Sequence, residues 1–264
     1  MQDIKVSFVQ SDILWNDPKG NIENFGKQIE SLNEKTDLIV LPEMFSTGFN
    51  MKPQHCFETM DGNTMQWMKE KARETHAVIC GSLLIKENGH FFNRLIWMRP
   101  DGTLSFYNKK HLFRMAGENN MYTEGTERAI VKLKKFNFLL QVCYDLRFPV
   151  WSRNRYHNGT YDYDGIIYVA NWPAIRQHAW CTLLMARAIE NQAYVIGVNR
   201  VGADDNGFEH AGNSMIISPK GEILKEAAPY KNTITSTTLS KESLDLFRGK
   251  FLAGADWDNF EIKL

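Results

Sequence analysis

The chain has 264 residues, of which 43% are hydrophobic and 23% charged, a composition that excludes a largely disordered protein. Its 31 basic and 31 acidic residues give a formal net charge of zero, which argues against a nucleic-acid or membrane-surface protein. No apolar run approaches the roughly 20 residues that span a bilayer, and the first residues lack the features of a signal peptide. We therefore expect no membrane and no nucleic acid among its partners.

Strands and helices are predicted to alternate along the chain. Apolar residues two apart at 4–8 indicate a strand, helical spacing follows at 22–32, and the apolar run 38–41 is typical of a strand buried on both faces. Further strands are predicted at 77–85, 91–98, 104–107, 136–142, 165–170, 193–198, 214–218 and 222–225, with helices at 65–72 and 182–191. This order predicts an α/β fold with a mixed sheet or two sheets.

No linker-like or low-complexity segment divides the chain, so we expect a single domain over residues 1–264. The polar segment 113–128 is predicted to be a long irregular loop, and such loops inside compact domains are often functional. The motifs GxGxxG, GxxxxGK[ST], HExxH and GxSxG are absent, and the seven histidines lack metal-ligand spacing. Cysteine chemistry without a metal or cofactor is left as the main catalytic candidate.

The four cysteines fit reduced thiols in a cytoplasmic protein, since none has CxxC spacing: Cys56, Cys80, Cys143 and Cys181. Cys143 stands out because an apolar strand runs directly into it and polar residues and a proline follow. A nucleophile at a strand end projects into the cleft where open α/β sheets bind ligands. Taken alone, however, a free cysteine is more often a small core residue.

Two charged residues follow other predicted strands. Glu43 ends the buried segment 38–42, where a carboxylate is costly unless it is hydrogen-bonded or functional. Lys109 follows the strand 104–107 in the segment YNKKHLF, and its alternative interpretation is an ordinary surface lysine. By themselves these two positions leave a structural and a functional interpretation open.

Three segments together resemble the nitrilase superfamily of carbon–nitrogen hydrolases: LPEMFSTGF at 41–49, YNKKHLF at 107–113 and CYDLRFP at 143–149. ANWP at 170–173 and ARAIENQAYV at 186–195 match as well, so the resemblance extends from about residue 3 to 240. The segments HLFRM, CYDLRFPVWSRN and ANWP are most similar to the bacterial omega-amidase (2-oxoglutaramate amidase) branch.

The resemblance implies a four-layer α-β-β-α sandwich with a Glu-Lys-Cys triad formed by Glu43, Lys109 and Cys143. It also implies a second glutamate in the loop after the lysine, for which Glu118 fits better than Glu124, and a homodimer. The backbone N–H of Tyr144 is expected to face the developing oxyanion. Asn171 and Trp172 either line the pocket or form a structural turn.

Several neighbouring residues are expected to be structural. Asp145 and Arg147 are predicted to brace the nucleophile loop as an ion pair, and His111 to donate or accept a structural hydrogen bond. On the predicted helix after ANWP, we expect three residues to act as anchors: Arg187, Glu190 and Asn191.

The resemblance implies hydrolysis of a small-molecule amide, with ω-amides of α-keto dicarboxylic acids such as 2-oxoglutaramate and 2-oxosuccinamate as substrates. A substrate carboxylate needs a cation, which Arg114 or Arg176 can supply. The same triad also suits another amide, a carbamoyl compound or a nitrile. Two other classes stay open, namely a papain-like Cys143–His111 dyad oriented by Asn171, and a small-molecule binding module in which Cys143 is inert.

Overall fold

The computed structural model describes residues 3–262, and in it two six-stranded sheets pack face to face around a core of buried apolar side chains. The first sheet contains β16 (Thr233–Leu239), β1 (Ile4–Gln10), β2 (Leu38–Val40), β3 (Val78–Glu87), β4 (His90–Met98) and β5 (Leu104–Asn108), in that spatial order. The second contains β15 (Ile223–Glu226), β14 (Met215–Ile217), β11 (Tyr194–Asn199), β10 (Gly165–Ala170), β7 (Phe136–Val142) and β6 (Ala129–Leu133).

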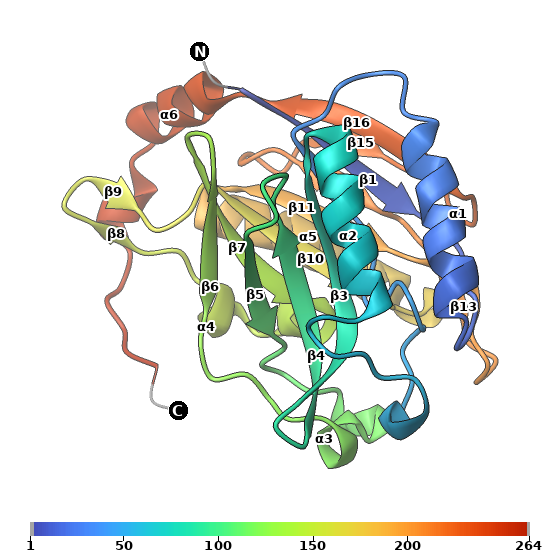
Figure 1. The fold of residues 1–264 in the computed structure, drawn as a ribbon. Helices are drawn as coiled ribbons and strands as arrows, with labels where there is room; N and C mark the ends of the chain where they lie inside the picture. Colours follow the sequence, from blue (N-terminus) through green and yellow to red (C-terminus); the bar gives the residue numbers. More distant parts are fainter. Residues whose placement is uncertain (1–2, 263–264) are drawn as a thin grey trace.

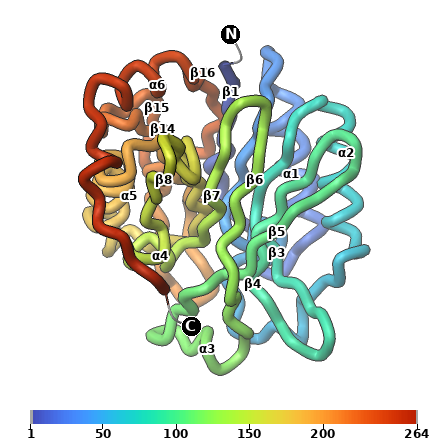
Figure 2. The backbone as a smooth tube through the Cα atoms, turned by 90° about the vertical axis from the view of Figure 1, so that its left-hand side faces the viewer, coloured from blue at the N-terminus to red at the C-terminus, as the bar shows by residue number. Residues whose placement is uncertain are grey.

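Helices cover the outer face of each sheet and complete four layers (Figures 1 and 2). The helices α1 (Pro18–Glu30) and α2 (Asn63–Thr75) pack on the first sheet, and α5 (Gln177–Asn191) packs on the second. The remaining elements are α3 (Glu118–Met121), α4 (Pro149–Ser152), α6 (Lys241–Lys250) and the two-stranded pairs β8–β9 (Tyr156–His157, Thr160–Tyr161) and β12–β13 (Val201–Ala203, Glu209–Ala211). The predicted α-β-β-α sandwich is confirmed.

Alternation within each strand divides its side chains between two cores. On β2, Leu38 and Val40 face the core between the sheets, whereas Ile39 packs toward the helices. On β10, Ile167 and Val169 face the core between the sheets, and Ile166 packs toward α5. Both faces of these strands are buried, which explains their uninterrupted apolar sequences.

The two sheets repeat one pattern of strand directions. In each sheet three neighbouring strands are parallel, β1-β2-β3 in the first and β7-β10-β11 in the second. An antiparallel strand flanks them on one side, and two antiparallel strands continue the sheet on the other. The parallel strands end near one another, and this is where the polar residues singled out in the sequence lie.

Three of the larger elements escaped the sequence prediction. Strand β16 (TITSTTL) has a polar, half-exposed sequence without clear alternation, and β6 is short and partly exposed. Helix α6 buries only Leu244 and Arg248, so its apolar periodicity is weak. The segment 113–128, predicted to be irregular, contains a 3-10 turn at Arg114–Ala116 and the single-turn helix α3.

Candidate active site

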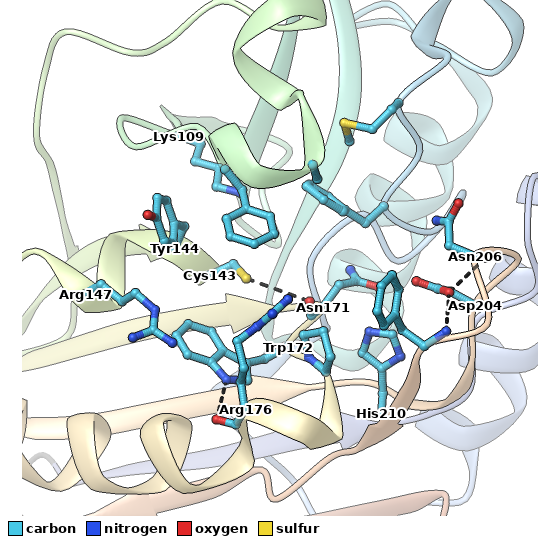
Figure 3. Close-up of a pocket in the computed structure, with 16 residues that line it drawn as sticks. Lys109, Cys143, Tyr144, Arg147, Asn171, Trp172, Arg176, Asp204, Asn206 and His210 are labelled. Atoms are coloured by element: carbon cyan, nitrogen blue, oxygen red, sulfur yellow. Dashed lines mark hydrogen bonds between the residues drawn. The ribbon is translucent and has the colours of Figure 1, made fainter.

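A cavity of about 250 Å³ lies at the ends of β7 and β10 (Figure 3). Five of the seven residues proposed for catalysis and support line it: Lys109, Cys143, Tyr144, Asn171 and Trp172. Glu43 and Glu118 are fully buried and contact the cavity residues from within the protein. The structure therefore brings all seven proposed site residues together.

Cys143 begins a 3-10 turn (Cys143–Arg147) directly after β7. Its φ of +44° lies in the left-handed region, which a residue with a side chain adopts at an energetic cost. The turn is held by Asp145, whose Oδ2 accepts the Val142 N–H at 2.9 Å. The Cys143 thiol lies 4.0 Å from the backbone oxygen of Asn171 and faces the cavity (Figure 3).

Lys109 bridges two buried glutamates. Its Nζ lies 3.0 Å from Oε1 of Glu43 and 2.9 Å from Oε2 of Glu118, and all three side chains are almost completely inaccessible to solvent. Glu118 also accepts the Phe113 N–H at 2.5 Å, which anchors the loop after β5. Glu124, the alternative second glutamate, instead pairs with Lys110 at 3.4 Å.

The buried charges set the protonation of the site. Burial alone would lower the pKa of Lys109, but the carboxylates of Glu118 and Glu43 outweigh burial and raise that pKa, so the ammonium persists. Burial raises the pKa of the Cys143 thiol well above its usual range, and the negative charge of Glu43 adds to this effect. The resting site therefore contains a neutral thiol beside a charged lysine.

Asn171 holds Glu43 from the second sheet. Its backbone N–H donates to Oε2 of Glu43 at 2.7 Å, and its side-chain amide donates to the Glu43 carbonyl at 2.5 Å. Its neighbour Trp172 lines the cavity and donates its backbone N–H to Asn199 at 2.8 Å. The segment after β10 thus both forms the cavity wall and fixes one of the site carboxylates.

The predicted Asp145–Arg147 ion pair is wrong. Asp145 accepts hydrogen bonds from the Tyr107 hydroxyl at 2.9 Å and from the His111 backbone at 3.0 Å, and its Oδ1 lies 2.8 Å from His111 Nδ1. His111 stacks on Phe148, with ring centroids 3.8 Å apart, and it is not among the residues that line the cavity. His111 therefore has the structural role predicted for it, which leaves the Cys143–His111 dyad without geometric support.

Two arginines line the cavity. The guanidinium of Arg176 lies 5.4 Å from the Phe113 ring centroid, and that of Arg147 lies 4.8 Å from the Trp172 ring centroid (Figure 3). Neither forms an ion pair with any residue between 3 and 262. Arg114, the other candidate cation, is exposed and does not line the cavity.

Two of the polar residues near the site, Arg147 and Asn93, were not predicted to belong to it. Arg147 was assigned to an ion pair, although its position four residues after the nucleophile already placed it on the same turn. Asn93 lies within β4 and donates to both Glu43 and Glu118. No sequence signal separated it from the other residues of that strand.

The anchors on α5 are confirmed as structural contacts. Arg187 pairs with Glu190 at 2.8 Å and donates to the Leu146 carbonyl at 2.6 Å, whereas Asn191 accepts the Asn154 N–H at 2.8 Å. They tie α5 to the turn after Cys143 and to the segment that follows α4.

Between residues 3 and 262 no group of three or more His, Cys, Asp or Glu side chains is arranged to hold a metal ion. Within the same range no helix has the length and hydropathy needed to cross a membrane.

The fold places the chain among the α-β-β-α sandwich proteins of the nitrilase superfamily. The carbon–nitrogen hydrolase superfamily protein XC1258 from Xanthomonas campestris superposes with a TM-score of 0.97, at 42% identity over the whole of both chains. The family model for carbon–nitrogen hydrolases matches residues 5–248. The chain belongs to the carbon–nitrogen hydrolase family.

Curated relatives match over nearly their full length. The chain is 45% identical to the omega-amidase YafV of Yersinia enterocolitica, covering 98% of this chain and 99% of that protein. It is 32% identical to the 2-oxoglutaramate amidase of Bacillus subtilis, covering 91% of this chain and 93% of that protein. The resemblance inferred from the sequence motifs is therefore confirmed at the level of the family and of its omega-amidase relatives.

Proposed function

We propose that this protein hydrolyses ω-amides of α-keto dicarboxylic acids, such as 2-oxoglutaramate and 2-oxosuccinamate, to the acid and ammonia through a thioester on Cys143. The observation that carries the proposal is a cavity in which a cysteine, a buried lysine and two unpaired arginines meet, with Glu43 fixed beside them. The similarity to omega-amidase YafV and to a 2-oxoglutaramate amidase supports the substrate class.

The first half of the reaction forms the thioester. As Sγ of Cys143 bonds to the amide carbon, its proton passes to the Glu43 carboxylate, since the thiol is neutral at rest. The carbonyl oxygen becomes an oxyanion that Lys109 and the Tyr144 N–H stabilise, and one such donor typically contributes about 2.7–4 kcal/mol. Glu43 then gives the proton to the amide nitrogen, the C–N bond breaks and ammonia leaves.

The second half releases the acid. Water loses a proton to Glu43 and attacks the thioester carbon, and the C–S bond breaks as the proton returns to sulfur. Glu118 holds Lys109 through two contacts of 2.9 and 3.1 Å, so the ammonium stays in place through both halves. The reaction requires no metal or organic cofactor.

Arg147 and Arg176 are proposed to bind the carboxylate end of the substrate. Both line the cavity with Cys143, and the guanidinium group of each lies over an aromatic ring at cation–π distance. An unpaired guanidinium in a cavity is suited to a bidentate carboxylate contact. Arg114 is exposed and does not line the cavity, which favours Arg147 and Arg176 for this role.

This assignment predicts strong selectivity for a carboxylate-bearing ω-amide. We expect kcat/KM for 2-oxosuccinamate to exceed that for propionamide by roughly 30- to several-thousand-fold, because a substrate without the carboxylate leaves a cation unpaired, at about 2–5 kcal/mol. Arg176→Met and Arg147→Met should each shrink this ratio, whereas Arg114→Met should not. Steady-state kinetics at fixed pH and salt measure it, and faster turnover of propionamide would contradict the ω-amide proposal.

The alternative within the same chemistry is another amide, a carbamoyl compound or a nitrile. An ammonia-release screen distinguishes these substrates if it includes glutamine, both keto ω-amides, aliphatic amides, carbamoyl amino acids and nitriles. A binding module with an inert Cys143 would release ammonia from none of them.

Three further proposals concern the domain, the oligomeric state and the cellular compartment of the protein. We propose one domain over residues 1–264, a homodimer, and the cytoplasm as the compartment. Free cysteines and a thiol nucleophile suit the reducing conditions of the cytoplasm. The homodimer is supported by exposed apolar side chains near the cavity and on α5, where Ile175 is 83% and Ile189 55% accessible. Light scattering should give twice the 30.5 kDa chain mass.

A further inference from the structure

Asn93 is a buried amide that contacts both glutamates of the site. It lies on β4, is 1% exposed, and does not line the cavity. Its Nδ2 lies 2.7 Å from Oε1 of Glu43 and 3.3 Å from Oε1 of Glu118. Asn93 therefore cannot touch a substrate in the cavity, but it touches two of the side chains that act there.

The orientation of this amide is fixed by a directed chain of hydrogen bonds. The Met44 N–H donates to Ser82 Oγ at 2.9 Å, so the Ser82 hydroxyl hydrogen is left to donate to Oδ1 of Asn93, also at 2.9 Å. With Oδ1 occupied, both N–H groups of Asn93 face the carboxylates. A flipped amide would place its oxygen against two carboxylates and the Ser82 hydroxyl against an N–H pair.

The site needs such a donor because its charges do not balance. Two buried carboxylates share the single ammonium of Lys109, at 3.0 Å from Glu43 and 2.9 Å from Glu118. A buried carboxylate must have hydrogen-bond donors for its remaining lone pairs. The Asn93 amide supplies two N–H groups without adding a charge, so Lys109 is not drawn wholly to one glutamate.

We propose that Asn93, oriented by Ser82, is a positioning residue that holds Glu43 and Glu118 at fixed places around Lys109 and so keeps Glu43 ready to accept the thiol proton. The proposal rests on the function proposed above, because it assigns the proton transfer to Glu43. Without Asn93, Oε1 of Glu43 retains only Lys109 as a partner, while Oε2 retains the Asn171 N–H. The carboxylate is then free to tilt toward the lysine.

The test compares Asn93→Leu and Ser82→Ala with a matched control, Ser7→Ala. Ser7 is a fully buried serine on β1 of the same sheet, bonded to Thr36 and Ser236 and remote from the cavity. Thermal unfolding reports the cost of removing a buried polar group in all three variants. Kinetics on 2-oxosuccinamate from pH 5 to 10 give kcat, KM and their pH dependence. Crystal structures of the variants give the positions of Glu43 and Glu118.

For Asn93→Leu we expect kcat to fall about 100-fold with KM nearly unchanged, because a misplaced base slows the chemistry more than binding. The acid limb of the kcat profile should move to higher pH, since a carboxylate that loses a donor is protonated more easily. Ser82→Ala, which removes only the orienting hydroxyl, should show the same two changes to a smaller degree. Ser7→Ala should lower stability without moving the profile.

Three results separate the possible failures. If the wild type hydrolyses no ω-amide, the proposed function fails. The crystal structures alone then decide whether Asn93 holds Glu43 and Glu118 in place. If both variants superpose on the wild type at Glu43 and Glu118, the positioning role is wrong. It is also wrong if the variants lose stability like Ser7→Ala while kcat and its pH profile stay as in the wild type. Should Asn93→Leu not fold, Ser82→Ala decides by the same criteria.

Discussion

Replacing Cys143 with alanine is expected to abolish hydrolysis, with turnover falling about a millionfold or to background. The loss is this large because the thiol, its base and the oxyanion donor act as one unit, so removing the nucleophile removes the whole covalent pathway. Initial rates of ammonia release measure it. Of the four cysteines, only Cys143 lines the cavity with Lys109.

The other three cysteines provide the control. Alanine at Cys56, Cys80 or Cys181 should leave turnover close to that of the wild type, since none of them lines the cavity. Peptide mass spectrometry of the enzyme quenched during turnover should find the acyl group on Cys143. An acyl adduct on a different cysteine would refute the assignment of the nucleophile. Because burial raises the pKa of the Cys143 thiol, slow alkylation by iodoacetamide would not argue against it.

Glu43→Gln and Lys109→Ala are each expected to lower kcat by several orders of magnitude, on the scale seen when members of a catalytic unit are removed. Glutamine cannot accept the thiol proton, and alanine leaves the oxyanion without its cation while two buried carboxylates lose their shared partner. His111→Gln should act mainly through stability, because it loses the contact with Asp145 and the stacking on Phe148.

The pH dependence provides a second measurement for the same assignment. The neighbouring glutamates outweigh burial and raise the pKa of Lys109, so its ammonium should survive well above neutral pH. The alkaline side of the kcat/KM profile should therefore show no loss that comes from deprotonation of Lys109.

The mutation series also has an outcome that would contradict the triad. A folded His111→Gln variant without activity, together with near-normal turnover of Glu43→Gln, would support the cysteine–histidine dyad instead.

The sequence singled out the residues of the proposed triad because each lies at or just after the end of a strand. Glu43, Lys109 and Cys143 follow buried or half-buried strands, and a charged or nucleophilic residue at such a place is conspicuous against apolar neighbours. The resemblance then supplied their order and the sandwich architecture. Glu118 was predictable only through that resemblance, since its segment reads as a polar loop.

Asn93 and Arg147 were missed for different physical reasons. Asn93 is one polar residue in the middle of β4, and its meaning appears only when β3 places Ser82 beside it and two glutamates approach from elsewhere. The sequence predicts an ion pair between Arg147 and Asp145 because both lie close to the nucleophile in the same loop. In the structure the tight turn sends Asp145 into the core and Arg147 into the cavity, so neighbours in sequence have opposite environments.

The repeated strand pattern of the two sheets has a consequence for how the chemistry is divided. Glu43 follows β2, the middle parallel strand of the first sheet, and Asn171 follows β10, the middle parallel strand of the second. These matching positions meet, since Asn171 donates twice to Glu43. The proposed base Glu43 and the proposed cation Lys109 follow strands of the first sheet, and the proposed nucleophile Cys143 follows a strand of the second, so neither sheet carries all three. If these roles hold, the chemistry depends on the alignment of two similar halves, and we expect substitutions buried between the sheets to alter turnover without touching the site residues.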